Sequence, residues 1–433
     1  MGNLDIQSRF AEDLSVSADY EKVAAKYRSI FTKIAQGTVE REQQRILPYE
    51  QINWLKQLGF GALRVPAKFG GDGVSLPQLF KLLTELAKAD SNIVQALRGH
   101  FAFVEDRLNA HKLENQDVWF KRFVQGDLVG NAWTEIGQVK IGNVLTRVTQ
   151  NNHQPSSHQS TNNSLNNNQF LVNGKKYYST GTIFADWVDL FAYDETTDQH
   201  VIAAISRHAS GVEVFDDWDG FGQKTTGSGT LTLYNVPIER DHILPFDQRF
   251  KYQTAFYQVI HLATLTGIAK SALATFIEEV QKRDRIFSHG NADLVRNDPQ
   301  ILQVIGKASA QVYASESITL HTAEALQHAY ISHFGESEVK NIQANINAEL
   351  ESSQGQVVIA DLVLDLTSQL FNTLGASASS TAKQLDRFWR NARVVSSHNP
   401  LIYKEKVIGD WEVNHEPLPF VWQIGKSPKS DVA

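Results

Sequence analysis

The chain has 433 residues and a formal net charge of −7, with 42% hydrophobic and 21% charged residues. This composition is typical of a globular protein with two or three packed units, and without a basic stripe we expect no nucleic-acid partner. The sequence shows no secretory signal and no apolar run as long as a membrane span, so we expect a cytoplasmic protein without a membrane partner. Cysteine is absent, which excludes disulfides and thiolate catalysis. The one methionine is Met1, and this low sulfur content favours synthesis under sulfur scarcity.

Residues 1–126 are predicted to form an N-terminal α-helical domain. Ser75 and Pro77 are suited to the start of a helix, and the loop at 65–73 has three glycines in four positions, which predicts positive φ or close backbone approach. After Ser75, apolar side chains recur at the spacing of an amphipathic helix, at Leu79, Leu82, Leu83, Leu86 and Ala87.

Residues 127–243 are predicted to form an antiparallel β-barrel or sandwich. Asn173-Gly174 directly follows one short β-rich run and precedes another, which predicts a hairpin turn there. The runs that carry this interpretation are Phe170–Val172, Trp187–Ala192 and Gly229–Tyr234.

A polar insert at 150–169 interrupts the middle domain. It is dominated by Asn, Gln, Ser, Thr and His, and cannot bury enough apolar surface to order itself. His153 and His158 are compatible with a metal site, but without a carboxylate a mobile hairpin loop is favoured. The long-helix histidines also lack a pattern of acidic partners, so we predict no metal site; these are His321, His328 and His333.

Residues 244–433 are predicted to form a C-terminal four-helix bundle followed by a docking tail. Long stretches with helical periodicity run over 261–282, 299–331 and 337–374. The complete chain is therefore predicted to be α+β, in the order α, β, α.

Six segments of the chain carry motifs that occur together in one order: Val65–Gly73, Asn131–Glu135, Asn173–Gly181, Gly222–Gly229, Gln369–Gly375 and Leu385–Arg393. This is the order found in the acyl-CoA dehydrogenase family, which the chain resembles over nearly its whole length. The resemblance implies a flavoprotein, usually tetrameric, that binds its flavin between the β domain and the bundle.

The resemblance also implies which residues bind the cofactor. Thr134 and Thr180 are expected at strand ends, where a hydroxyl and a backbone N–H can bond the isoalloxazine edge. Arg283 and Arg285 would supply charge-assisted bonds to the cofactor phosphate, which Gln369 and the following loop reach from a neighbouring subunit in relatives. The remaining cofactor candidates are Asn131, Trp133, Asn372, Gly375 and His398.

Acyl-CoA dehydrogenases need a carboxylate base, and this sequence lacks one at both known positions. The position after the Arg-rich run is Asn399, and the position early in the first bundle helix is Tyr257, with Gln258 beside it. Asn399 cannot act as that base, and neither Tyr257 nor Gln258 is a carboxylate. The nearest acid, Glu405, is six residues away.

The run Trp389–Arg393 followed by Ser396, His398, Asn399 and Pro400 resembles a branch of the fold that includes the dibenzothiophene monooxygenases. In that branch a separate NAD(P)H:flavin reductase delivers reduced FMN, which reacts with O₂ to a C4a-hydroperoxide that oxygenates sulfur, nitrogen or aromatic carbon. The implied function is a two-component monooxygenase for a small organosulfur or related compound. Its catalytic candidates are His398, His100, Thr180 and Ser179.

Structural alternatives to these roles stay open. His398 could be a helix-terminal histidine, His100 a core histidine and Thr180 a solvated strand residue. Arg283 or Arg285 could pair with Glu279 along a helix. An FAD-dependent acyl-CoA dehydrogenase with a displaced base and a non-catalytic flavin-fold scaffold remain rival functions. FAD remains possible, and the sequence does not choose the substrate or between a dimer and a tetramer.

Overall fold

The computed structural model describes residues 18–137, 139–151, 169–422 and 424–427. It forms two compact units, described here one at a time. Unit 1 comprises residues 1–95, 219–226 and 251–420, and unit 2 comprises 96–218, 227–250 and 421–433. The division into 1–126, 127–243 and 244–433 stays a prediction. His153, His158 and nearly all of the polar insert lie outside the described residues.

The N-terminal part of unit 1 is helical, and its predicted amphipathic helix is α5 (Leu76–Ala89). Ser75 caps this helix: its side chain accepts from the N–H of Gln78, and the Gln78 side chain accepts from the N–H of Ser75. Pro77 lies in the first turn, and the predicted leucine face is buried. The other helices here are α2 (Tyr20–Gln36), α3 (Thr38–Gln44), α4 (Tyr49–Gln57) and the beginning of α6 (Ser91–Ala110).

The glycine loop before α5 has both predicted properties. Gly70 and Gly73 have φ of +97° and +61°, where a side chain would be strained. At Gly71 a Cβ atom would lie 2.1 Å from the carbonyl oxygen of Val65. The loop is therefore compact because two of its glycines turn the chain and the third lets two backbone segments touch.

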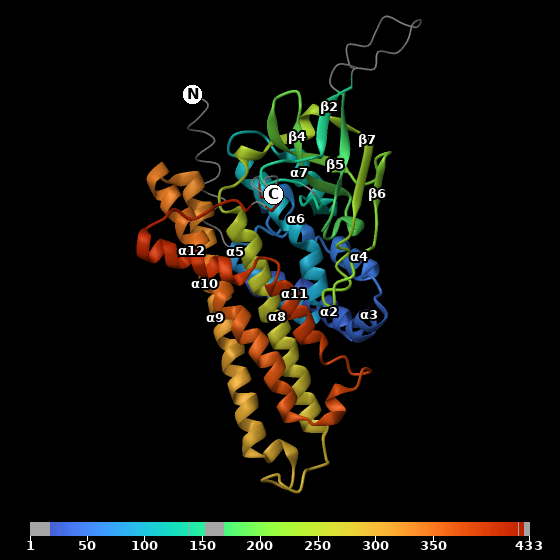
Figure 1. The fold of residues 1–433 in the computed structure, drawn as a ribbon, viewed down its shortest axis with the longest axis vertical. Coiled ribbons are helices and arrows are strands. Elements are labelled where there is room, and N and C mark those ends of the chain that lie inside the picture. The colour runs from blue at the N-terminus through green and yellow to red at the C-terminus, as the bar shows by residue number, and fades with distance from the viewer. Residues whose placement is uncertain (1–17, 138, 152–168, 423, 428–433) are drawn as a thin grey trace, which may run out of the picture. The chain divides into compact units, whose positions relative to one another are not determined.

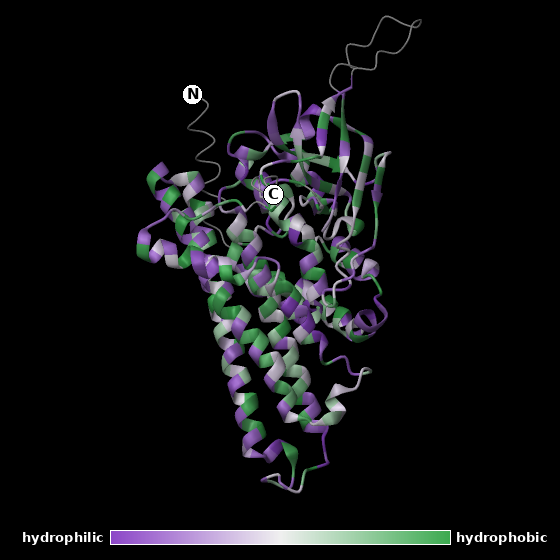
Figure 2. Ribbon diagram, viewed as in Figure 1, coloured by the Kyte–Doolittle hydropathy of each residue, from purple (hydrophilic) through white to green (hydrophobic). Residues whose placement is uncertain are grey.

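Three long helices run side by side in unit 1 (Figure 1): α8 (Gln253–Lys282), α9 (Pro299–Gly335) and α10 (Glu338–Gln369). α11 (Arg387–Ser396) packs on α8 and α10, and α12 (Leu401–Asn414) packs on α10. Figure 2 shows hydrophobic and hydrophilic residues alternating along α9 and α10, as expected for helices with one buried face. α8 is long and apolar enough to cross a membrane, but 67% of its apolar window is buried, as in a core helix.

Unit 2 contains α7 (Asp117–Val124) and a sheet with the strand order β6-β7-β3-β2-β4-β5-β8, with β1 paired to β4. The pairs are antiparallel as predicted, except that β1 and β2 each run parallel to β4, which long connections make possible. The strands are β1 (Val129–Ala132), β2 (Arg147–Gln150), β3 (Gln169–Lys176), β4 (Trp187–Asp194), β5 (Gln199–Ser206), β6 (Val212–Val214), β7 (Leu231–Glu239) and β8 (Ile243–Pro245).

The hairpin turn predicted at Asn173-Gly174 is wrong, because both residues lie inside β3. The register between β3 and β7 shifts between Val172 and Gly174, so the pair marks a β-bulge. A Cβ atom on Gly174 would lie 2.5 Å from Oγ1 of Thr146. Glycine is needed here for close approach to a neighbouring segment, a requirement that sequence reasoning mistook for a turn.

Candidate active site

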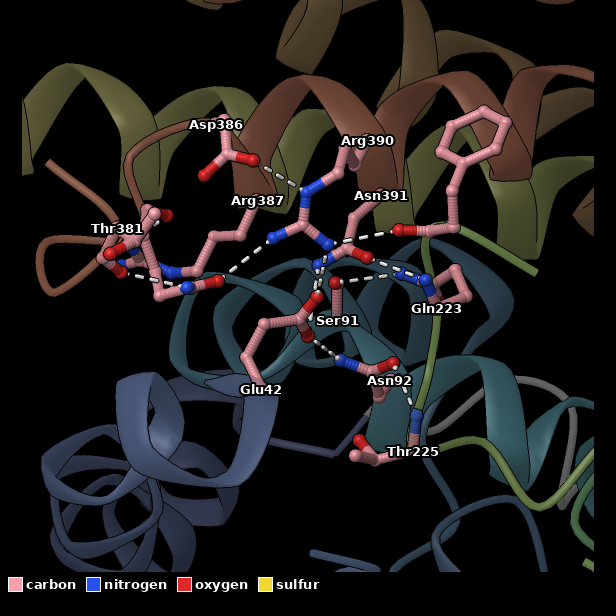
Figure 3. A network of polar contacts seen from close by, with 12 residues as sticks. Glu42, Ser91, Asn92, Gln223, Thr225, Thr381, Asp386, Arg387, Arg390 and Asn391 are labelled. Atoms are coloured by element: carbon pink, nitrogen blue, oxygen red, sulfur yellow. Dashed lines mark hydrogen bonds and ion pairs between the residues drawn. The ribbon is translucent and has the colours of Figure 1, made fainter. Parts of the chain in front are cut away.

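Arg390, in the signature run on α11, forms a buried ion pair in unit 1 (Figure 3). Its Nη1 donates to Oε1 of Glu42 at 3.1 Å and to the backbone oxygen of Phe221 at 2.9 Å. Its Nε donates to Oδ2 of Asp386 at 2.7 Å. The side chain of Glu42 is 1% exposed, whereas that of Asp386 is 60% exposed. α11 is thus joined to α3 and to the segment at 221–225.

Asn391 fixes the same segment from the next position of α11. Its Oδ1 accepts from the backbone N–H of Gln223 at 2.5 Å, and a Cβ atom on Gly222 would lie 2.3 Å from the carbonyl oxygen of Arg390. Asn92 of α6 accepts from the N–H of Thr225 at 3.2 Å (Figure 3). The Arg-Asn pair of the signature is therefore structural, because it holds one other family motif, Gly222–Gly229, and helix α3 against α11.

His398 lies in the short turn at 397–400 that joins α11 to α12. Its backbone N–H donates to the oxygen of Val395 at 3.2 Å, and its side chain is exposed within unit 1. The centroid of its ring lies 4.5 Å from that of His261 on α8, with 46° between the ring planes. His261 is buried, at 1% exposure. The turn follows the C-terminal end of α11, where a helix dipole favours a cationic histidine.

The two positions where the family keeps its base, Asn399 and Tyr257, lie close together in the structure, because Asn399 bonds to Gln258, the neighbour of Tyr257. Nδ2 of Asn399 donates to Oε1 of Gln258 at 3.0 Å, and Nε2 of Gln356 on α10 donates to the backbone oxygen of Asn399 at 2.7 Å. Glu405 is exposed on α12. The arrangement holds a turn in place and has no carboxylate at either family position to accept a proton.

In unit 2, Ser179 and Thr180 follow β3 in a strained turn. Tyr178 has φ of +60°, and a Cβ atom on Gly181 would lie 1.9 Å from the carbonyl oxygen of Ala96. The Ser179 hydroxyl donates to the backbone oxygen of Gly229 at 2.7 Å. The Thr180 hydroxyl lies 2.8 Å from the hydroxyl of Ser228. Ser179 therefore holds the backbone, while Thr180 belongs to a pair of hydroxyls that can exchange donor and acceptor roles.

His100 is fully buried on α6, among aromatic rings of unit 2. Its Nδ1 accepts from the backbone N–H of Val129 at 3.2 Å. This contact assigns the neutral tautomer with the proton on Nε2, since Nδ1 cannot carry a proton while accepting. These surroundings resemble those of a core histidine, and a catalytic part for His100 stays a prediction.

The other flavin candidates of unit 2 lie on β1 and just after it. Asn131 is buried, and Gly99 allows α6 to approach it so closely that a Cβ atom would lie 2.8 Å from the Asn131 side chain. The Trp133 indole donates to Oδ1 of Asp189 at 3.0 Å, and the backbone oxygen of Thr134 accepts from Tyr177 at 2.9 Å. β1 and the segment after it are therefore held in place before any ligand binds.

Arg249 lies behind Trp133 and is part of a buried charge cluster. Its Nη1 lies 3.2 Å from Oδ2 of Asp189, and its guanidinium lies 4.9 Å from the Trp133 ring centroid. Burial raises the pKa of Asp189. Burial also acts to raise the pKa of Asp106, but Arg107 and Arg249 outweigh it and hold that pKa below its usual value. The cluster orients the indole.

Comparison with known proteins agrees with this architecture. Residues 259–401 match the family described as acyl-CoA dehydrogenase, C-terminal domain. FMN-bound TdsC from Paenibacillus sp. A11-2 has a TM-score of 0.79 at 24% identity, over 92% of this chain and 98% of that one. The chain thus has the acyl-CoA dehydrogenase fold, and its C-terminal part is similar to that family.

Among the sequence relatives, two of the most similar are monooxygenases by name. The probable FMNH2-dependent monooxygenase SfnC of Pseudomonas putida is 24% identical over 400 residues, covering 90% of this chain and 95% of its own. Dibenzothiophene monooxygenase of Mycolicibacterium goodii is 25% identical over 408 residues, covering 90% and 94%. The predicted resemblance to monooxygenases with the acyl-CoA dehydrogenase fold is confirmed.

The phosphate-end candidates that the superfamily implies lie around the bottom of the bundle in unit 1. A cavity of about 320 Å³ is lined by Arg283, Asn372 and Gly375, with Phe287 and Leu374. Arg283 Nη1 donates to the oxygen of Leu374 at 2.6 Å, and a Cβ atom on Gly375 would lie 3.4 Å from Arg283 Nη2. The cavity thus has a cation beside a residue without a side chain, which suits an anionic group; Asp298 also lines it, but its carboxylate accepts from the backbone N–H groups of Asn291 and Gln300.

The other two candidates of this region lie beside the cavity and do not line it. Gln369 ends α10, and its Oε1 accepts from Nδ2 of Asn372 at 2.9 Å. Arg285 is exposed, and its backbone oxygen accepts from Nε of Arg283 at 3.0 Å. The alternative pairing with Glu279 is taken by another residue, because the Lys383 ammonium bonds to Glu279.

Sequence reasoning missed His261 and Ser228 as site residues. His261 lies four residues after Tyr257, the position considered for a base, and therefore on the same face of α8. Searching that face for polar side chains would have found it. Ser228 lies in a quoted family motif, but only the fold places it beside Thr180. Glu42 carried no sequence signal. Among the described residues, no group of three or more His, Cys, Asp or Glu side chains is placed to hold a metal ion.

Proposed function

We propose that this protein is a reduced-FMN-dependent monooxygenase that oxygenates a small organosulfur compound. One observation carries the proposal: Asn399, at one position of the family base, bonds to Gln258, the neighbour of Tyr257 at the other position, and a histidine pair lies beside these two amides. Such a site can hold and protonate a bound oxygen species, and it lacks the carboxylate with which the dehydrogenases deprotonate a thioester. The relatives are named as an FMNH2-dependent and a dibenzothiophene monooxygenase, which supports this choice of reaction.

The residues present suit FMN. In unit 1, Arg283 would bind the phosphate in the cavity beside Gly375, with Asn372 as a neutral donor, Gln369 behind it and Arg285 supporting it from outside. FMN needs no further pocket for an adenosine, and the solved relative TdsC holds FMN.

In unit 2, hydrogen-bonding groups would contact the flavin ring edge through Thr180, its partner Ser228 and Thr134, with Asn131 and Trp133 shaping the wall. Reduced FMN supplies the electrons that activate O₂. The pre-formed hydrogen bonds of this segment mean that little reorganisation is needed on binding.

The catalytic work of the side chains would be to manage one proton and to exclude water. His398 would donate a proton to, or accept one from, the bound oxygen species, because imidazole titrates near neutral pH. Thr180 would orient that species through its hydroxyl, and Ser179 would hold the turn. His100 keeps one N–H at Nε2 and would serve as a fixed donor.

We further propose a soluble NAD(P)H:flavin reductase as partner, assembly as a homotetramer, and a cytoplasmic protein with the three-domain division 1–126, 127–243 and 244–433. The absence of cysteine and of any methionine beyond Met1 supports a part in sulfur acquisition, where a protein low in sulfur is economical. Dibenzothiophene, named for the relatives, is an organosulfur compound and agrees with that part.

The test uses the purified chain with FMN, a flavin reductase and NADH. We expect oxygen uptake that depends on reduced FMN and an oxygenated product from a panel of sulfides, sulfones and sulfinates. When the same chain is given FAD and a panel of acyl-CoA thioesters without oxygen, the absorbance of the flavin should not bleach. Bleaching by any acyl-CoA would support a dehydrogenase instead, and failure to bind either flavin would support a scaffold.

A further inference from the structure

α8 presents two side chains to the turn at 397–400. Gln258 and His261 are three residues apart on one helix, so they share a face. They meet consecutive residues of the turn: Gln258 bonds Asn399 at 3.0 Å, and the His261 ring centroid lies 4.5 Å from that of His398. The turn is therefore matched to α8 residue by residue.

The α8 side of this contact is fixed, whereas the α11 side is a helix end. His261 is 1% exposed, and the stretch of α8 that directly follows it, Leu262–Ala269, is buried throughout. At Gly267 a Cβ atom would lie 2.3 Å from the side chain of Ala87, so α8 and α5 pack without a gap. His398, by contrast, is exposed within unit 1 and lies beyond the last residue of α11, where helices fray.

The backbone of the turn is held from α10 as well. Gln356 donates to the backbone oxygen of Asn399 at 2.7 Å. Beyond the turn, Lys404 of α12 is buried and bonds Glu349 and Ser353 of α10, each at 3.1 Å. These contacts fix the backbone that follows His398, whereas the side-chain torsions of His398 depend on what its ring touches.

We propose that His261 is a positioning residue for His398: the buried imidazole on α8 sets the orientation of the exposed imidazole, so that its ring nitrogens face the bound oxygen species. This inference rests on the proposed function. An imidazole held in one orientation delivers its proton along one direction, and a misplaced group loses much of that effect. His261 itself does not need to touch substrate or flavin.

A double-mutant cycle tests the proposal. The quantity measured is the fraction of the consumed reduced FMN that yields oxygenated product, and the remainder is measured as H₂O₂. We expect His261→Ala to lower that fraction about tenfold, and His261→Phe, which keeps a ring in the same place, to recover most of it. In a His398→Ala background, His261→Ala should change it less than about twofold, because the residue it positions is gone. Thr264→Val, a buried change on α8 whose hydroxyl bonds only within the helix, is the matched control and should leave the fraction unchanged.

A second measurement does not depend on flavin. With ¹³C-labelled histidine, the ring signal of His398 is identified by its loss in His398→Ala, and it should shift and narrow in His261→Ala but not in Thr264→Val. If His261→Ala does not fold, His261→Asn replaces it in both measurements. An unchanged His398 signal in His261→Ala would overturn the positioning role. So would a double variant whose loss of product fraction equals the product of the losses in His261→Ala and His398→Ala. Lack of oxygen uptake by the unaltered chain would instead remove the proposed function and leave the spectroscopic result to decide this inference.

Discussion

Replacing Glu42 by glutamine tests whether burial, rather than bond length, decides which contact holds the signature helix. Arg390 bonds two carboxylates: exposed Asp386 at 2.7 Å and buried Glu42 at 3.1 Å (Figure 3). Hydrogen bonds to charged groups contribute about 1.5–3 kcal/mol, and an arginine left without its buried partner costs about 3–5 kcal/mol. Since Arg390 keeps Asp386 and the Phe221 carbonyl, and its side chain is 14% exposed, we expect Glu42→Gln to cost about 2 kcal/mol.

The matched control is Asp386→Asn, which neutralises the other partner of the same guanidinium. Because Asp386 is 60% exposed, water and salt screen it, and we expect a cost of about 0–1 kcal/mol. Urea denaturation, followed by circular dichroism and tryptophan fluorescence, measures both variants; unit 1 and unit 2 can unfold separately, so the two signals are fitted independently. A cost for Asp386→Asn equal to or above that of Glu42→Gln would refute the reasoning.

Three further predictions concern the cavity and unit 2. Arg283→Ala should weaken FMN binding about tenfold in a fluorescence titration, because a charge-assisted phosphate contact is lost; unchanged affinity would remove Arg283 from the site. Gly181→Ala should yield little folded protein, since its Cβ would lie 1.9 Å from the Ala96 oxygen at a φ of +75°; normal expression and melting would contradict that clash. Burial and Arg122 lower the pKa of His242, so the unfolded chain binds a proton below about pH 6.5 that the folded chain binds less readily, and this group's stabilising contribution falls as pH drops through that range. His242→Gln should therefore flatten the loss of stability between pH 7 and 5 in urea titrations; an unchanged slope would refute the assignment.

Local features of the fold could be predicted where the cause is local. The leucine spacing after Ser75 gives α5 its buried face, and the cap is formed by Gln78 three residues on. The Asn173-Gly174 hairpin failed for the complementary reason: glycine serves close packing as well as turns, and the packing partner, Thr146, is distant in sequence. A pattern of residue types does not distinguish the two uses.

The candidate site divides in the same way. The loss of the base could be predicted from the sequence, because it depends only on the residue types at the base positions, which are Tyr257 with its neighbour Gln258, and Asn399. The hydrogen-bond partners of the polar groups in the site could not be predicted from the sequence. Thr180 meets Ser228 across 48 residues and Asn399 meets Gln258 across 141. His398 was predicted, whereas the ring that touches it was not.

The sequence by itself determined the order of helical and β segments, the turn and cap chemistry of α5, and the absence of an acid from both family base positions. Only the tertiary structure decided that Glu42 holds Arg390 across 348 residues and that His261 lies against His398. The physical reason is that periodicity encodes which face of an element is buried, whereas the identity of the group across that face follows from how whole elements pack.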